Sequence, residues 1–396
     1  MLTSLALIFL CGISLGGVFQ KLRLPSLLGM IITGIILGPF TLGLIDASIL
    51  SASADLRRLA LVIILTKAGL TLDVADLKKV GRPAVLMCFL PACFEILATV
   101  LFAPMLLGLS VLEAAILGSV IAAVSPAVVV PRMIKLIETG YGTNKSIPQL
   151  VMAGASADDV FVIVLFTSFI ALANGGEISV LSFIKIPFSI LTGVTVGACL
   201  SKGLFIFFKK VHIRDSAKVI ILLSIFFLLL EAEEMLADKI PFSSLISIMA
   251  CGMGLLYFYP VLAGKLSNKF SKLWVAAEVL LFVLIGATVD ISYTMAAGAK
   301  AVALLVSVLG LRMVGVWCCL LKTELTKKER LFCMIAYTPK ATVQAAIGGI
   351  PLALGFSCGN IVLTAAVLSI LITAPLGAFG IDVAYKKLLS HSRNKE

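Results

Sequence analysis

The stretch AVSPAVVV (123–130) places Pro126 inside a long apolar segment, and Pro131 follows one turn later. Proline has no amide hydrogen, and its ring clashes with the preceding turn, so these prolines predict a broken helix. The stretch AYTPKATV (336–343) repeats the pattern around Pro339, 213 positions further along the chain. The sequence therefore predicts two interrupted helices at related positions.

The composition is that of a membrane protein. The 396 residues are 60% hydrophobic and only 13% charged, whereas soluble domains are about 25% charged. Apolar stretches near twenty residues recur from end to end, which predicts an all-α polytopic protein. Thirteen segments are expected, at roughly 2–19, 25–44, 56–73, 82–108, 111–131, 147–173, 180–207, 217–236, 240–259, 271–290, 295–321, 329–350 and 360–384.

The net charge of +11 reflects topology rather than a nucleic-acid surface. Lysine and arginine concentrate in the stretches that follow odd-numbered segments and are sparse elsewhere. This asymmetry predicts a multi-pass protein of the cell membrane (the inner membrane, if bacterial) with its N-terminus outside and its C-terminus in the cytoplasm. At membrane depth the sequence has neither a nucleophile–base set nor a metal motif, so we expect no enzyme and no cofactor.

Similar stretches recur at a nearly constant offset. KAGLTLD (67–73) matches LIGATVD (284–290), and LPSLLGMIITG (24–34) resembles IPFSSLISIMA (240–250). The offset pairs segments 1–6 with 8–13 and leaves segment 7 as a linker. A shift of seven helices inverts the second repeat in the membrane, as in secondary transporters. Chance similarity among apolar stretches is the alternative.

Adjacent carboxylates lie near the middle of segment 6, at Asp158 and Asp159 in GASADDV (154–160). Two neighbouring carboxylates do not both ionise cheaply in a low dielectric, so a proton and a cation compete for their oxygens. The freed carbonyls of the broken segment 5 are further candidate ligands. The candidate ion-binding residues are Asp159, Asp158, Ser125, Val124 and Ser156, with sodium or lithium at the two aspartates.

Other buried charges need a reason, because a charge at the bilayer centre is costly. Glu95 and Arg312 occupy equivalent repeat positions, 217 residues apart, which makes a buried ion pair plausible. Lys340 follows Pro339 and is expected to offset the negative end of a helix. For Glu95 and Arg312 we favour structural pairing over direct proton coupling.

These stretches resemble the cation/proton antiporter superfamily, closest to the NHA-type sodium/proton antiporters and their bacterial relatives. The stretches that carry the resemblance, in family order, are RLALVIILTKAGLTLD (58–73), SPAVVVPRM (125–133), GYGTNKSIPQL (140–150), GASADDV (154–160), LLFVLIGATVD (280–290) and PKATVQAA (339–346). The resemblance implies an NhaA-like fold with crossed broken helices, in which Asp159 binds the ion and Asp158 is its partner. It also implies that Arg312 replaces a lysine found in many bacterial members, with Glu95 as its partner.

The same resemblance implies a homodimer in membrane lipid, with no obligate protein partner, that exchanges sodium or lithium for protons by an elevator movement. The implied dimerisation domain comprises 1–73 and 217–290. The implied ion-transporting core comprises 82–173 and 295–384; the linker helix is 180–207, and the tail is 385–396. Alternatives are a potassium/proton antiporter, a sodium-coupled organic-anion symporter of similar fold, or a channel. Arg312 argues against a lysine proton as the second coupling ion.

Overall fold

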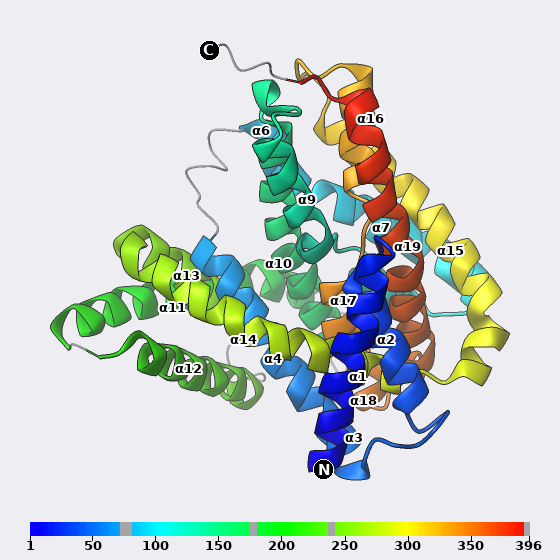
Figure 1. Ribbon diagram of the computed structural model, residues 1–396, viewed down its shortest axis with the longest axis horizontal. Helices are drawn as coiled ribbons and strands as arrows, with labels where there is room; N and C mark the ends of the chain where they lie inside the picture. The colour runs from blue at the N-terminus through cyan, green and yellow to red at the C-terminus, as the bar shows by residue number, and fades with distance from the viewer. Residues whose placement is uncertain (72–80, 174–179, 212, 237–241, 392–396) are drawn as a thin grey trace. The chain divides into compact units, whose positions relative to one another are not determined.

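The computed structural model describes residues 1–396 except 72–80, 174–179, 212, 237–241 and 392–396. Within the described residues, regular structure is helical apart from one isolated β-bridge between Tyr141 and His391 (Figure 1). The chain divides into two compact units. Unit 1 comprises Met1–Arg57, Asp76–Val162 and Val279–Glu396, and unit 2 comprises Arg58–Ala75 and Ile163–Glu278.

Unit 1 contains most of the helices. Its helices are α1 (Leu2–Lys21), α2 (Ser26–Leu37), α3 (Ala47–Ser51), α6 (Arg82–Met87), α7 (Leu90–Leu107), α8 (Val111–Ile121), α9 (Pro126–Glu138), the 3-10 helix η1 (Thr143–Lys145), α15 (Ile291–Cys319), α16 (Lys327–Ala336), α17 (Thr342–Ile347), α18 (Ile350–Ala353) and α19 (Gly359–Leu388). Helix α1 packs against α2, α7 packs against both α8 and α15, and α19 packs against α15 and α16 (Figure 1).

Unit 2 is built around α11 (Val180–Lys210), α12 (Asp215–Leu236) and α13 (Ser244–Phe258). Helix α13 packs against α11 and α12. Three long helices contribute residues to both units, namely α4 (Ser53–Thr71), α10 (Ile147–Ala173) and α14 (Pro260–Ala287).

Eight helical stretches in the described residues are long and apolar enough to cross a membrane, and three shorter apolar helices accompany them. Each of the thirteen predicted segments overlaps between one and three helices. How many of them span the bilayer stays a prediction. Residues 72–73 and 240–241, at the ends of two predicted segments, lie outside the described residues.

Three predicted boundaries were wrong by seven residues or more. Helix α9 ends at Glu138, seven residues beyond the predicted end at 131. Helix α2 ends at Leu37, although the apolar segment 25–44 predicts a helix up to residue 44. Gly38 precedes Pro39, and a residue before proline is disfavoured in helical conformation, so the chain turns there. Helix α14 begins at Pro260, eleven residues before the predicted start. The polar residues between Pro260 and the apolar stretch are compatible with a helix, so the helix is longer than the apolar stretch alone.

Two broken helices begin in the same way. Ser110 caps α8 and Thr326 caps α16, and each forms a capping box with the glutamate three residues later, Glu113 or Glu329. A capping box satisfies two amide groups at a helix start and fixes where the helix begins. Both helices therefore run a similar length from a defined start to the break.

Candidate ion site at the crossing of two broken helices

Two interruptions in the helices form the centre of the site. Helix α8 ends at Ile121 and α9 starts at Pro126, while α16 ends at Ala336 and α17 starts at Thr342. The amide of Ser125 donates a hydrogen bond to the carbonyl oxygen of Pro339 at 2.8 Å. The two unwound segments are therefore joined directly, backbone to backbone.

The prolines do not all act as predicted. Pro126 occupies the first position of α9, where a missing amide hydrogen costs nothing, and Pro339 lies within the second break. Pro131 does not mark a break, because α9 continues through it to Glu138. The fixed φ of proline is compatible with a helix, so α9 continues past Pro131 although the proline nitrogen donates no hydrogen bond.

Two positive side chains cap carbonyl oxygens at the end of α8 that have no partner within the helix. Lys340 Nζ donates to Ile121 O, and Arg312 Nη1 donates to Ala122 O. The last turn of a helix carries a partial negative charge that favours cations at this position. These contacts satisfy carbonyls that the break would otherwise leave unpaired.

Arg312 joins two carboxylates that come from different helices. Its Nη1 lies 2.9 Å from Glu95 Oε2 of α7, and its Nη2 lies 2.9 Å from Asp158 Oδ2 of α10. All three side chains are fully buried, at 0% exposure. Asp158 Oδ2 also accepts a hydrogen bond from the amide of Val124 at 2.9 Å. Val124 thus reaches the aspartate through its nitrogen, whereas its carbonyl was the predicted ligand.

Lys340 extends this chain of charges. Its Nζ lies 2.7 Å from Glu95 Oε1 and 2.8 Å from Glu95 Oε2. Its backbone amide donates to Thr373 Oγ1 of α19 at 2.9 Å, which holds the unwound segment near its end, just before α17. Glu95 is therefore shared between two cations, rather than forming a separate pair with Arg312 alone.

The four groups form an alternating series of charges that sums to zero: Asp158, Arg312, Glu95 and Lys340. Asp159 stands outside this series. It is 8% exposed, it forms no ion pair among the described residues, and its Oδ1 has no hydrogen-bond partner there. Asp158 Oδ1 is likewise buried and unpartnered. A buried carboxylate without a partner is costly unless it binds a proton or a cation.

Of the two serines predicted as ligands, the structure describes the side chain of Ser125 and not that of Ser156. Ser125 Oγ is buried and has no hydrogen-bond partner among the described residues, so it remains available as a ligand. The side chain of Ser156 lies outside the described residues, although its backbone belongs to α10.

Tyr337 contributes to the site but was not predicted from the sequence. Its carbonyl oxygen accepts from Arg312 Nε at 3.1 Å, and its ring lies 5.6 Å from the guanidinium carbon. Its hydroxyl donates to Met87 O at 3.3 Å. Gly154 leaves room for that hydroxyl, since a Cβ at this position would lie 1.9 Å from the tyrosine oxygen.

Gln344 is the second residue that the sequence reading missed. Its Nε2 donates to Ala123 O at 2.9 Å, across the junction of the two breaks, and its Oε1 is buried and unpartnered. The sequence signal for such a residue is a glutamine side chain in the first turn of the apolar helix that follows a proline break. Tyr337, two residues before Pro339, gives a similar signal.

Comparison with known proteins finds similarity to sodium/hydrogen exchangers over nearly the whole chain. Residues 5–386 match the family model described as sodium/hydrogen exchanger, transmembrane. The chain is 33% identical to sodium/hydrogen exchanger 9B2 of Homo sapiens over 415 residues, which cover 98% of this chain and 75% of that protein. It is 32% identical to the exchanger 9B2 of Mus musculus, over 100% of this chain and 75% of that protein.

A solved structure shows that the fold is shared as well. The sodium proton antiporter MjNhaP1 of Methanocaldococcus jannaschii aligns over 97% of both chains with a TM-score of 0.83. The sequences of the two chains are only 18% identical, so this likeness concerns the fold. The all-helical polytopic architecture is thus one already found in that antiporter.

Proposed function

Because the chain belongs to the sodium/hydrogen exchanger family, we propose that it exchanges sodium or lithium for protons and that Asp159 binds both. One observation carries the assignment to Asp159. The four buried charges of Asp158, Arg312, Glu95 and Lys340 compensate one another, and Asp159 has no ion-pair partner among the described residues. An ion or a proton then supplies the missing positive charge.

Competition for one carboxylate couples the two fluxes. When Asp159 holds a proton, its oxygens no longer attract a cation, and when it holds a cation, the proton is excluded. The unpartnered Oδ1 of Asp158 and Oγ of Ser125 are the additional oxygens proposed for the cation. Sodium and lithium prefer such hard oxygen ligands, as other hard cations do.

The charge balance also favours one-for-one exchange. A series that sums to zero leaves a single negative charge at Asp159, and one monovalent cation or one proton neutralises it. Lys340 is held by Glu95 and by a helix end, and Arg312 does not deprotonate in proteins. Neither is therefore proposed as a carrier of a second proton, and the exchange is electroneutral.

An elevator-type movement of the ion-transporting core is proposed for the step that carries the ion across. Inverted repeats would supply its two related conformations. The capping boxes at Ser110 and Thr326 support such a repeat, since they lie 216 positions apart, within one residue of the offset between Glu95 and Arg312. A homodimer with the dimerisation domain as its fixed part belongs to the same proposal.

Purified protein in sealed proteoliposomes tests this function. A pH gradient is imposed with the voltage clamped, and sodium, lithium or potassium is added outside in separate runs. We expect saturable proton movement with sodium or lithium and none with Asp159→Asn. Flux that does not saturate, or that the proton gradient does not reverse, would instead indicate a channel.

A further inference from the structure

Arg57 lies in unit 1 at the first turns of α4, and its charge has no ion-pair partner among the described residues. The side chain is only 4% exposed, and Nη1 has no hydrogen-bond partner among the described residues. Its Nε donates to the carbonyl oxygen of Ser53 at 3.2 Å, which orients the guanidinium. No salt bridge to Arg57 occurs in the part of the chain that the structure describes.

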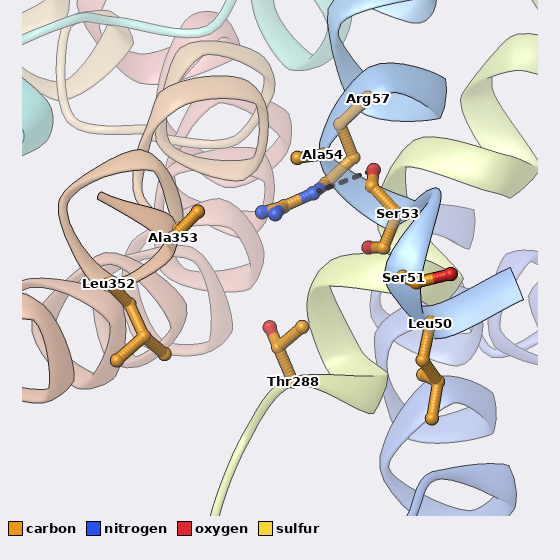
Figure 2. Close-up of a pocket in the computed structure, with 9 residues that line it drawn as sticks. Leu50, Ser51, Ser53, Ala54, Arg57, Thr288, Leu352 and Ala353 are labelled. Carbon is orange, nitrogen blue, oxygen red and sulfur yellow. Dashed lines mark hydrogen bonds between the residues drawn. The ribbon is translucent and has the colours of Figure 1, made fainter. Parts of the chain in front are cut away.

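A small cavity faces this guanidinium. It has a volume of about 180 Å³ and lies between the start of α4, the short helix α18 and Thr288 (Figure 2). Figure 2 shows the Arg57 side chain extending from α4 towards Ala353 of α18, with Ser53 beside it. The cavity is therefore lined on one side by donors and on the other by the apolar residues Leu352 and Ala353.

The surroundings keep the guanidinium in place. A Cβ at Gly349 would lie 2.2 Å from Arg57 Nη1, so only glycine lets the arginine approach the backbone at this point. Ser53 also lines the cavity and is only 2% exposed, and its Oγ has no hydrogen-bond partner among the described residues. Arg57 Nη1 and Ser53 Oγ are thus two buried donors beside one cavity, and neither has an acceptor among the described residues.

We propose that this cavity binds a phosphate group. A buried, unpaired guanidinium is costly, and a bound anion removes that cost. Arginine is suited to phosphate because its planar fork donates two parallel hydrogen bonds. The serine hydroxyl adds a donor, and the N-terminal end of the 19-residue helix α4 favours negative charge. The volume of the cavity accommodates a single phosphate with a few waters.

Two sources supply this chemistry, namely free inorganic phosphate and the phosphodiester of a lipid headgroup. The first is tested by thermal unfolding of the purified, detergent-solubilised protein, titrated with Tris phosphate at constant ionic strength. The second is tested by native mass spectrometry after incubation with phosphatidylglycerol. Neither readout depends on which ion the protein transports, so failure of this proposal and failure of the proposed exchange activity are distinguishable.

The variants are Arg57→Gln and the matched control Arg58→Gln. Arg58 carries the same charge one residue later, but it is exposed and pairs with Glu234 at 2.6 Å. We expect a saturable rise in Tm with phosphate, or a retained lipid, in the wild type and in Arg58→Gln, and neither in Arg57→Gln. Ser53→Ala should weaken the same signal several-fold, which gives a second test if Arg57→Gln fails to fold.

Each outcome decides the question. A Tm rise with phosphate assigns the cavity to a free anion, and retention of phosphatidylglycerol alone assigns it to a lipid headgroup. An equal response in wild type and Arg57→Gln, or no saturable response of the wild type to either probe, would overturn the proposal. In phosphate-free, delipidated buffer, Arg57→Gln should be at least as stable as the wild type, because it removes an unpaired buried charge.

Discussion

The amide of Ser125 and the carbonyl oxygen of Pro339 are hydrogen bonded at 2.8 Å, although the two residues lie in different broken helices. This bond fixes the unwound segments against each other. The positive charges gather at the same junction, because Arg312 and Lys340 cap carbonyls that the first break leaves without a helical partner. The junction of the two breaks therefore positions the charged side chains of the site.

Replacing Asp159 with asparagine should abolish exchange and leave the protein folded. The substitution keeps the size of the side chain and removes only the charge that has no partner in the network. Sodium-dependent proton movement in proteoliposomes, with Tm as the control for folding, measures the effect. Exchange at the wild-type rate by a folded Asp159→Asn protein would show that the ion binds elsewhere.

Asp158→Asn should behave differently from Asp159→Asn. Asp158 Oδ2 accepts from Arg312 and from the amide of Val124, so the loss of its charge leaves the arginine less well paired. We expect lower stability as well as weaker exchange. If the two variants are equally stable, Asp158 is not part of the charge network in the way we describe.

Glu95 and its two cations offer a stability test. Glu95→Gln leaves both Arg312 and Lys340 without their shared partner, and the expected cost is roughly 3–5 kcal/mol, the range for a broken buried ion pair. Adding Lys340→Gln should recover part of this loss, because one unpaired charge is removed. Equilibrium unfolding in mixed micelles measures both; a double mutant as unstable as the sum of the single mutants would contradict the shared pairing.

Gly154→Ala should destabilise the site through Tyr337. The added methyl group would collide with the tyrosine hydroxyl, and overpacking of this kind costs about 1–3 kcal/mol. In a Tyr337→Phe background the same substitution should cost less, since the colliding oxygen is absent. An equal cost in both backgrounds would mean that the strain lies against another neighbour, such as Met87.

Much of the site was accessible from the sequence because it rests on local signals. Proline marks the breaks at Pro126 and Pro339, and charge within an apolar segment identifies the aspartates, Glu95 and Arg312. The predicted repeat, with its offset of 217 residues, indicated a pair between Glu95 and Arg312, whose side chains lie 2.9 Å apart. The membrane character followed from composition alone.

The contacts that the sequence did not predict join helices that are not equivalent in the predicted repeat. Arg312 meets Asp158, and Lys340 meets Glu95, across 154 and 245 residues respectively. Such pairings depend on how α7, α10 and α15 pack around the two breaks, and one sequence does not specify that packing. The same holds for Tyr337, whose role follows from the space left at Gly154.

The stoichiometry can be read from the response to voltage. A network that sums to zero around a single free carboxylate predicts one cation for one proton, and hence no net charge movement. Exchange rates in proteoliposomes should not change when the membrane potential is stepped at a fixed pH gradient. A rate that rises or falls with the potential would require a second coupled proton, with Lys340 as the first residue to examine.

The dependence of the sodium half-saturation constant on pH tests the central claim most directly. The claim is that a proton and a cation compete for Asp159. Initial rates are measured in proteoliposomes from about pH 6 to pH 9. The constant should rise about tenfold per pH unit on the acidic side, while the maximal rate at saturating sodium changes little. A constant that stays flat while the maximal rate falls would contradict competition at one carboxylate and would place the proton sensor away from the ion site.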